Sequence, residues 1–393
     1  MIWRKVSPKS FAIAAFVVKN IANKSVVSRL FPTFVKNRTM SSFYKLNIKE
    51  VRRETNDAVS VLFNVPLEFK DFYRFTSGQY INLKLTLDGE ELRRAYSICS
   101  APDSGELRIA IKSVTNGHFS KFANTQLKEG QTLEVGTPEG KFTFEPDASR
   151  QKNYAAFAAG SGITPILSII KSVLVSEPKS TFVLVYGNKT PESTIFYQQL
   201  HDLQLKYVGR FFVHFVFSQA KVSESIFGRI EKSTVNFVLN NKHKELAFDK
   251  FYLCGPEAMI NTVSHVLREH NVKESAIKFE LFSTAPTTTS AEAAAAENLG
   301  GHSKITVMVD DEETTFEMSH KQTILEAALK QGLDAPYSCQ GGICSSCLAK
   351  VTSGSAVMKK NAILTDGEIA QGLILTCQAH PTSDTIYVDY DDV

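Results

Sequence analysis

Four cysteines near the carboxyl-terminal end constrain the fold of this chain more than any other feature. Three of them lie in one short loop, Cys339-x4-Cys344-x2-Cys347, and Cys377 follows after 29 intervening residues. Four thiolates at this spacing are typical of a plant-type 2Fe–2S centre, in which each iron takes two protein ligands. We therefore predict that the fold returns Cys377 to the loop and that these four cysteines hold such a cluster.

Two other uses of the cysteines are less consistent with the sequence. Structural zinc sites usually come as two Cys-x2-Cys pairs, and the second pair is missing here. Disulfide frameworks belong to short secreted chains, whereas this chain has 393 residues and six cysteines, four of them clustered. Small residues at Gly341, Gly342 and Ser345 leave backbone N–H groups free to point at the sulfurs. Zinc, and buried or disulfide-paired cysteines, remain the alternatives.

Charge is distributed unevenly along the chain. Residues 302–393 contain 13 acidic and 6 basic side chains, while the whole chain has a formal net charge of +3, so the first 301 residues carry about +10. An acidic module joined to a basic body indicates docking on that body or on a basic partner. The average composition excludes wholesale disorder and a fibrous architecture, and no stretch approaches the ~20 apolar residues that span a bilayer.

The amino-terminal segment is basic, because residues 1–49 contain ten Lys or Arg and no Asp or Glu. Its apolar run, Phe11–Val18, is too short to span a membrane, and no convincing cleavage site follows. We predict that residues 1–40 form a dispensable extension, with targeting or membrane attachment as alternatives. We expect a cytoplasmic protein without stable membrane insertion, or a mitochondrial-matrix protein if the extension is a transit peptide.

Residues 41–147 are predicted to form a first domain of short strands separated by Gly- and Pro-containing turns. Such spacing predicts a small antiparallel β-barrel, here of six strands. The predicted strands lie at residues 44–48, 59–65, 80–87, 94–98, 107–114 and 132–135.

The pattern changes after Pro146, where continuous apolar strands alternate with a helical pattern. This alternation predicts an α/β domain over residues 148–284, with a parallel sheet covered on both faces. Small and polar residues dominate residues 285–301, which we predict to be a linker, and residues 302–393 form the last domain. The predicted strands are 154–159, 181–186, 211–217, 251–254 and 304–309, and the predicted helices are 165–175 and 323–330.

Two motifs in the barrel region have the chemistry to bind a flavin. In Arg94-Ala95-Tyr96-Ser97, the guanidinium can pair with a phosphate, the tyrosine ring can stack on the isoalloxazine, and the serine can hydrogen-bond near N5. Gly117-His118-Phe119-Ser120 opens a helical stretch whose free N–H groups suit a pyrophosphate. Each motif alone would be an ordinary strand or loop, and His118 alone a solvated loop residue. Together they predict FAD.

Three strand ends in the α/β region predict a nucleotide site. Gly160-Ser161-Gly162-Ile163-Thr164-Pro165 links an apolar strand to a helix whose dipole favours an anion, although it lacks the full G-x-G-x-x-G pattern. Tyr186-Gly187-Asn188-Lys189 and Cys254-Gly255-Pro256-Glu257-Ala258-Met259 end two more strands. Ligands bind outside the carboxyl ends of such strands, so we predict NAD(P)H here, with three ordinary turns as the alternative. Cys254 is expected near the nicotinamide, and Cys99 is expected only to pack.

These motifs together resemble the ferredoxin–NADP reductase superfamily, and the added cysteine loop resembles the iron–sulfur flavoprotein reductases that supply oxygenases. The resemblance covers roughly residues 41–393. It implies an FAD-binding barrel, an NAD(P)H-binding α/β domain and a β-grasp ferredoxin domain. The order FAD–NAD–ferredoxin resembles reductase subunits of phenylacetyl-CoA epoxidases. This implies a multicomponent oxygenase, of the di-iron type, as the electron acceptor in phenylacetate catabolism, and no nucleic-acid partner.

The resemblance also assigns roles residue by residue. Its FAD contacts are Arg94, Tyr96, Ser97, Gly117 and Ser120. Its nicotinamide-nucleotide contacts are Gly160, Gly162, Thr164, Lys189, Ser218, Cys254, Gly255 and Pro256, with Ser97 and Cys254 beside the hydride-transfer face. Phe282 is a candidate flavin shield, or else a core residue. Relatives often carry Arg where Lys189 stands and a basic residue where Gln219 stands, so NADPH is favoured only slightly over NADH.

The predicted activity is electron transfer from NAD(P)H through FAD and a 2Fe–2S cluster to an oxygenase. A flavin is needed because the hydride carries two electrons and the cluster accepts one. The alternatives are a reductase for a Rieske dioxygenase, a fatty-acid hydroxylase or a hybrid-cluster protein, and a redox sensor without catalytic function.

Overall fold

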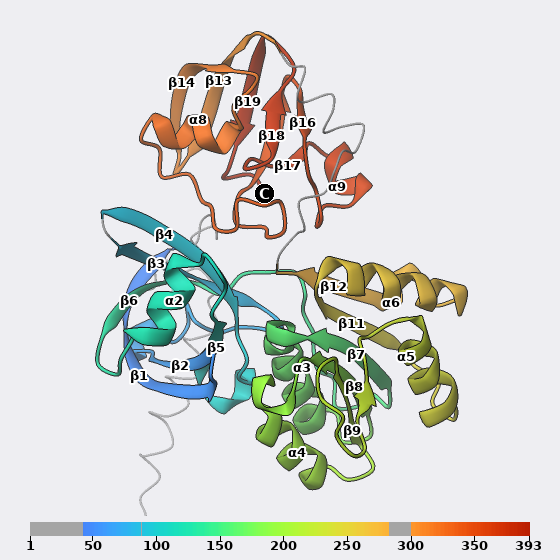
Figure 1. Cartoon of the computed structure of the whole chain (residues 1–393). Coiled ribbons are helices and arrows are strands. Elements are labelled where there is room, and N and C mark those ends of the chain that lie inside the picture. The colour runs from blue at the N-terminus through green and yellow to red at the C-terminus, as the bar shows by residue number, and fades with distance from the viewer. Residues whose placement is uncertain (1–41, 88, 283–299) are drawn as a thin grey trace, which may run out of the picture. The chain divides into compact units, whose positions relative to one another are not determined.

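The first folded part of the chain is a six-stranded antiparallel sheet that closes into a barrel (Figure 1). The strand order is β4-β3-β6-β1-β2-β5, and an antiparallel bridge between Ile98 and Ile109 joins the two edge strands. The strands are β1 (Phe43–Thr55), β2 (Ala58–Asn64), β3 (Tyr80–Leu87), β4 (Glu90–Ser97), β5 (Leu107–Lys112) and β6 (Thr132–Gly136). Helix α2 (His118–Thr125) packs Phe119 and Ala123 into the barrel core.

The computed structural model describes residues 42–87, 89–282 and 300–393. The predicted extension, residues 1–40, and residues 285–299 of the predicted linker lie outside the described residues. Within the three described ranges, no helix combines the length and apolar character needed to cross a membrane.

The second part is a six-stranded sheet in which every neighbouring pair is parallel. Its order is β10-β9-β8-β7-β11-β12, so the chain reverses direction across the sheet between β7 and β11. The strands are β7 (Asn153–Ala159), β8 (Thr181–Asn188), β9 (Phe211–Phe217), β10 (Ile226–Phe227), β11 (Lys250–Gly255) and β12 (Ile277–Leu281).

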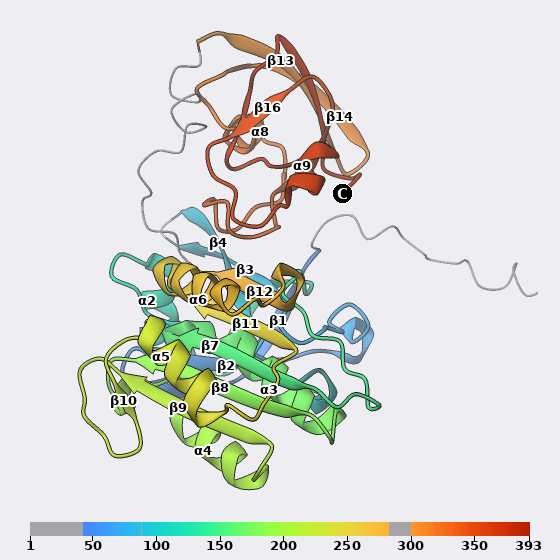
Figure 2. The ribbon, with the colours of Figure 1, turned by 90° about the vertical axis from the view of Figure 1, so that its right-hand side faces the viewer.

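Helices cover both faces of the parallel sheet, as the continuous apolar strands require. On one face, Ala156 packs with residues of α3 (Ile163–Ser176) and α4 (Tyr197–Lys206). On the other, Phe157 packs with residues of α5 (Lys232–Phe237) and α6 (Glu257–Glu269). Figure 2 shows α5 and α6 on the side of the sheet that faces the viewer. Two short helical segments adjoin these helices. The 3-10 turn η4 (Gly160–Gly162) precedes α3, and the π-helical segment η6 (Val238–Lys242) extends α5.

The last part is a small mixed sheet with one helix on its face. The order is β14-β13-β19-β15-β17, with β13 and β19 parallel and the other pairs antiparallel. Helix α8 (Ile324–Lys330) begins after Thr323, whose hydroxyl accepts a hydrogen bond from the Glu326 amide, and buries Ile324 and Ala328 against the sheet. The remaining elements are β13 (His302–Val309), β14 (Glu312–Ser319), β15 (Leu348–Ser353), β16 (Ala356–Met358), α9 (Asp366–Ala370), β17 (Leu373–Leu375), β18 (Ala379–Pro381) and β19 (Thr385–Asp389).

The predicted fold class is confirmed: an antiparallel barrel, a parallel α/β sheet and a ferredoxin domain. Individual elements differ at their ends. Strand β4 begins at Glu90 instead of Arg94, because its charged first half pairs with β3 as an edge strand whose side chains need no burial. No bounds were predicted for strand β12 (Ile277–Leu281), although its five residues alternate apolar and polar as those of a half-buried strand do. The proposed domain boundaries at 147, 284 and 301 stay predictions.

Candidate functional site

A cavity of about 430 Å³ lies where β4, α2, the start of α3, the end of β12 and the cysteine loop meet. We call it the central cavity. It brings together six of the predicted nucleotide-binding residues, the candidate flavin shield Phe282 and two of the predicted cluster ligands. These lining residues are Arg94, Tyr96, Ser97, Gly117, Ser120, Thr164, Phe282, Cys339 and Cys344. A cavity of this size with a largely apolar wall and a few polar groups is typical of a cofactor site.

The end of β4 supplies an aromatic ring and a free cation to the central cavity. Tyr96 lies 5.7 Å from Phe119 between ring centroids, and burial raises the pKa of its hydroxyl. The Arg94 guanidinium donates to the backbone oxygen of Arg93 at 2.6 Å, and no acidic side chain in the described ranges forms an ion pair with it. Its remaining N–H groups are therefore free for a phosphate, which fits the predicted flavin nucleotide.

Helix α2 begins at the cavity wall with the second predicted flavin motif. Gly117 is the residue before the helix, and the Ser120 hydroxyl closes the first turn by donating to the Gly117 oxygen at 3.2 Å. The same hydroxyl accepts the Val114 amide at 3.2 Å. Because Ser120 is engaged within the turn, the amides at the start of α2 are the groups left for a pyrophosphate.

The glycine turn before α3 is pressed against the end of β11. A Cβ atom at Gly162 would lie 2.1 Å from the carbonyl oxygen of Cys254, so only glycine allows this approach. Thr164, two residues later, faces the central cavity and donates its hydroxyl to the Ser161 oxygen at 3.0 Å. Gly160 and Gly162 themselves do not line the cavity.

Cys254 and Glu280 lie side by side at the carboxyl ends of β11 and β12. Cys254 is fully buried behind the cavity wall, whereas Glu280 lines the cavity and accepts a hydrogen bond from the Ser97 hydroxyl at 3.2 Å. Burial raises the pKa of Glu280 to about 8, and burial together with the Glu280 charge raises the pKa of the Cys254 thiol. Sequence reasoning missed Glu280. The only indication in the sequence was an acidic residue within a short segment of alternating apolar and polar residues.

The predicted residues for the rest of the nucleotide lie along the same edge of the parallel sheet. Lys189 follows β8, and Ser218 follows β9. The two strand ends are tied together because the Gln219 amide donates to the Lys189 oxygen at 2.9 Å. Gly255 ends β11, and Pro256 precedes α6. None of these four lines the central cavity, so they lie outside the volume that holds the flavin motifs.

The structure brings the four predicted cluster ligands together. Cys339 and Cys344 lie 3.1 Å apart between sulfurs. The Thr376 amide and hydroxyl both donate to the Cys347 oxygen, at 3.1 and 3.0 Å, and this holds the neighbouring Cys377 against the loop. A hydrogen bond from Cys344 lowers the pKa of Cys339, and one from Cys377 lowers the pKa of Cys347. Cys377 is hydrogen-bonded to both Cys339 and Cys347, so the four thiols form one connected group, and together they supply the four thiolates that two irons require.

The cysteine loop has the backbone geometry of an anion cradle. Gln340 has a positive φ of 51°, and Gly342 one of 71°. A Cβ atom at Gly342 would lie 2.8 Å from the backbone oxygen of Lys360. The Gly341 amide donates to the Cys339 sulfur at 3.3 Å. Across the described residues no three His, Cys, Asp or Glu side chains surround a single metal position, and the donor set fits a binuclear cluster held by thiolates.

Polar contacts hold the cysteine loop against the barrel. The Tyr80 hydroxyl lies 3.1 Å from the Ser345 hydroxyl and 3.2 Å from the Ser346 hydroxyl, and the Asn82 amide donates to Ser346 at 3.1 Å. Arg93 pairs with Asp334 at 2.7 Å. A flavin motif and a cysteine cluster that share one cavity define a flavin-dependent iron–sulfur reductase.

Three family models match consecutive parts of the chain. They are an oxidoreductase FAD-binding domain at residues 45–144, an oxidoreductase NAD-binding domain at 157–265 and a 2Fe-2S iron-sulfur cluster binding domain at 307–382. The chain belongs to the ferredoxin-reductase family of oxidoreductases that bind FAD, a nicotinamide nucleotide and a 2Fe–2S cluster.

Relatives match nearly the whole described chain. One subunit of the 1,2-phenylacetyl-CoA epoxidase of Escherichia coli K12 is 39% identical over 354 residues, covering 90% of this chain and 99% of that protein. The ferredoxin reductase component of the 3-ketosteroid-9-alpha-monooxygenase of Rhodococcus rhodochrous is 31% identical, covering 88% and 96%. The solved structure of phthalate dioxygenase reductase shares the fold, with a TM-score of 0.56 at 23% identity, covering 88% and 98%.

Proposed function

We propose that this reductase delivers electrons from NAD(P)H to a multicomponent oxygenase, and that its acceptor is a di-iron phenylacetyl-CoA epoxidase complex. The observation that carries the electron path is the central cavity, whose lining includes Tyr96 and Ser97 of the barrel and Cys339 and Cys344 of the cysteine loop. A flavin held by the barrel residues would therefore share this cavity with two of the proposed cluster ligands.

The barrel residues hold the flavin in this proposal. Arg94 binds a phosphate through its unpaired N–H groups, and the start of α2 after Gly117 binds the pyrophosphate. Tyr96 would stack on the ring, and Ser97, whose hydroxyl donates a hydrogen bond to Glu280, would be the polar group near its N5. When bound, the flavin accepts a hydride and releases single electrons. The walls of the cavity exclude water and oxygen from that ring.

The edge of the parallel sheet holds the nicotinamide nucleotide. Thr164 and the amides at the start of α3 bind its pyrophosphate, with Gly160 and Gly162 leaving room for the backbone approach. Cys254, Gly255 and Pro256 border the nicotinamide. Lys189 and Ser218, joined at neighbouring strand ends, are the groups that would contact a 2′-phosphate, which favours NADPH.

The choice of partner rests on two observations. The relative with 39% identity is a subunit of a phenylacetyl-CoA epoxidase, and it is matched over 99% of its length. The ferredoxin domain is acidic, so the acceptor should present a basic surface, and its turnover should fall as salt shortens the Debye length below about 10 Å. We further propose a cytoplasmic location and the domain boundaries 41–147, 148–284, 285–301 and 302–393.

Reconstitution with purified oxygenases tests the partner. The chain, loaded with FAD and cluster, is mixed with a phenylacetyl-CoA epoxidase complex, a Rieske dioxygenase or a hybrid-cluster protein, and oxygenated or reduced product per NADPH is measured. We expect coupled product formation with the epoxidase, and none with a Cys344→Ser variant. Efficient coupling to one of the other acceptors alone would overturn the proposed partner while leaving the reductase activity intact.

A further inference from the structure

Helix α3 carries a line of polar side chains although it is buried along most of its length. Eleven of its fourteen residues are buried, and eight of these are apolar. The buried Ser168 and Ser172 and the half-buried Lys171 are spaced by three and four positions and therefore share one face of the helix. Buried polar groups on an apolar helix are stable only with hydrogen-bond partners, so this face should meet a polar surface.

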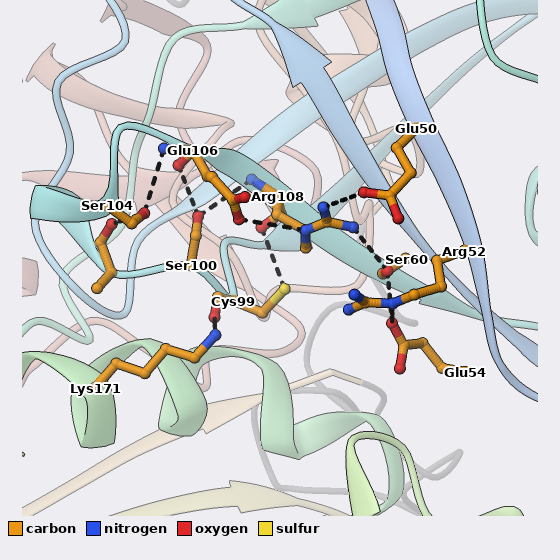
Figure 3. Close-up of polar contacts among 11 residues, drawn as sticks. Glu50, Arg52, Glu54, Ser60, Cys99, Ser100, Ser104, Glu106, Arg108 and Lys171 are labelled. Atoms are coloured by element: carbon orange, nitrogen blue, oxygen red, sulfur yellow. Dashed lines mark hydrogen bonds and ion pairs between the residues drawn. The ribbon is translucent and has the colours of Figure 1, made fainter. Parts of the chain in front are cut away.

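That surface is the barrel segment that follows the flavin motif. The Ser168 hydroxyl donates to the Ser100 backbone oxygen at 2.7 Å, and the Lys171 ammonium donates to the Cys99 backbone oxygen at 3.0 Å. One turn further, the Ser172 and Ser77 hydroxyls lie 2.5 Å apart. Figure 3 shows the Lys171 side chain extending from α3 to the Cys99 carbonyl.

The peptide unit that Lys171 contacts is fixed on its other side as well. The Cys99 amide donates to the Arg108 backbone oxygen at 2.8 Å, and its thiol lies 3.3 Å from the same oxygen. Arg108 is itself held by Glu50 at 2.5 Å and by the Ser60 hydroxyl at 3.2 Å (Figure 3). Three elements, β4, β5 and α3, therefore meet at Cys99.

Placing the Lys171 ammonium at this contact removes part of its hydration. Its ammonium forms no ion pair with any acid in the described ranges, and its one hydrogen bond goes to a backbone carbonyl. Burial lowers the pKa of the amine, and the charges of Glu106, Arg108 and Arg52 and the Cys99 thiol also act on it. An apolar side chain would avoid desolvating a charge but would leave the Cys99 carbonyl without this donor, so what the lysine adds at this position is the contact itself.

Helix α3 connects the two halves of the reaction site. Thr164, in the first turn, lines the central cavity where the nucleotide is proposed to bind, and Lys171 lies two turns later on the same helix. Cys99, at the other end of the contact, follows Ser97 by two residues. We propose that Lys171 is a positioning residue that fixes the flavin motif against the nucleotide turn, and so sets the approach of the nicotinamide to the flavin. This inference rests on the proposed placement of both nucleotides.

Stopped-flow reduction of the FAD-loaded chain by NADPH without oxygen tests it. Lys171→Met keeps an unbranched side chain that is one atom shorter and removes the donor and charge. We expect hydride transfer at saturating NADPH to slow by on the order of ten-fold or more, with a larger primary isotope effect from C4-deuterated NADPH. Lys171→Arg should recover most of the rate. The control, Lys232→Met, removes an exposed ion pair between Lys232 of α5 and Glu269 of α6 and should match the wild type.

The outcomes separate this inference from the proposed function. Wild-type flavin that neither NADPH nor NADH reduces would contradict the function itself. If wild-type flavin is reduced but FAD-loaded Lys171→Met reduces at the same rate, the positioning role is wrong. The positioning role is also wrong if the variant loses only FAD content and melting temperature while the FAD-loaded fraction keeps the wild-type rate and isotope effect, because that is what a purely structural lysine would give.

Discussion

The Ser97 hydroxyl donates a hydrogen bond to the Glu280 carboxyl across 3.2 Å, and this bond joins the last residue of β4 to the edge strand β12. The barrel motif proposed to face the flavin is thus tied to the sheet proposed to hold the nicotinamide. The acid at this junction lines the central cavity, and desolvation there raises its pKa above that of an exposed glutamate.

Glu280 should make the stability of the protein depend on pH. Its pKa is about 8 in the folded chain and near 4.5 when unfolded, so between these values only the folded state holds the proton. Stability from this group is fully present below pH 4.5 and falls as pH rises toward 8, by at most about 1.4 kcal/mol per pH unit. Denaturant melts of wild type and Glu280→Gln between pH 5 and 8 measure this. The free energy of unfolding of the wild type should fall relative to that of the variant as pH rises. If the two free energies instead change in parallel with pH, the interpretation of Glu280 as an acid with a raised pKa is wrong.

Removing one cluster ligand should abolish the cluster without abolishing electron transfer from the flavin. Cys344→Ser removes one of four thiolates, so iron should fall from about two atoms per chain toward none. Ferricyanide reduction, which takes electrons from the flavin, should continue, whereas reduction of cytochrome c through the cluster should be lost. Cys99→Ala is the matched control, since Cys99 is also buried but lies in the barrel. Retention of both irons in Cys344→Ser would contradict the ligand set.

The contact between Arg93 and Asp334 should matter for transfer between the cofactors more than for stability. Arg93 is buried beneath the Tyr337 ring, at 4.7 Å from its centroid, while Asp334 is largely exposed, so the ion pair itself is worth about 1 kcal/mol or less. We expect Arg93→Ala to slow cluster reduction several-fold with flavin reduction unchanged. Arg52→Ala, which breaks an exposed pair within the barrel, is the control. Equal rates in both variants would remove this contact from the electron path.

The coenzyme preference should depend on the strand ends after β8 and β9. Lys189→Ala should raise KM for NADPH on the order of ten-fold and leave KM for NADH nearly unchanged, because a charge-assisted bond to the 2′-phosphate is lost. Gln219→Arg should act in the opposite direction by adding a cation beside Lys189. Steady-state ferricyanide reduction with both coenzymes measures this. Equal effects of Lys189→Ala on the two would place Lys189 outside the 2′-phosphate site.

Those parts of the site that depend on local spacing were predictable from sequence. Cys339, Cys344 and Cys347 share one loop, and a strand followed by a glycine turn and a helix is visible around Gly160. Glu280 was not predictable, because its high pKa arises from burial by elements distant in sequence. The same holds for Lys171, which looks like an ordinary helix lysine until α3 packs against the segment after Ser97.

The contacts between the ferredoxin domain and the barrel were also not predictable from the sequence. Ser345 was noted only as a small residue in the cluster loop, yet Ser345 and Ser346 contact Tyr80 and Asn82 some 265 positions earlier. Charge asymmetry indicated that an acidic module would meet a basic surface, and the pair of Arg93 with Asp334 is of that kind. The identity of the contacting residues depends on how the two surfaces pack in three dimensions, which composition does not reveal.

The most direct test of the account is an anaerobic titration of the reconstituted chain with NADPH, followed by visible absorbance and low-temperature EPR on the same samples. The account predicts a yellow protein whose flavin absorbance bleaches and whose reduced cluster gives a rhombic signal. A chain that holds FAD and iron, yet shows neither bleaching nor that signal with NADPH or NADH, would contradict it.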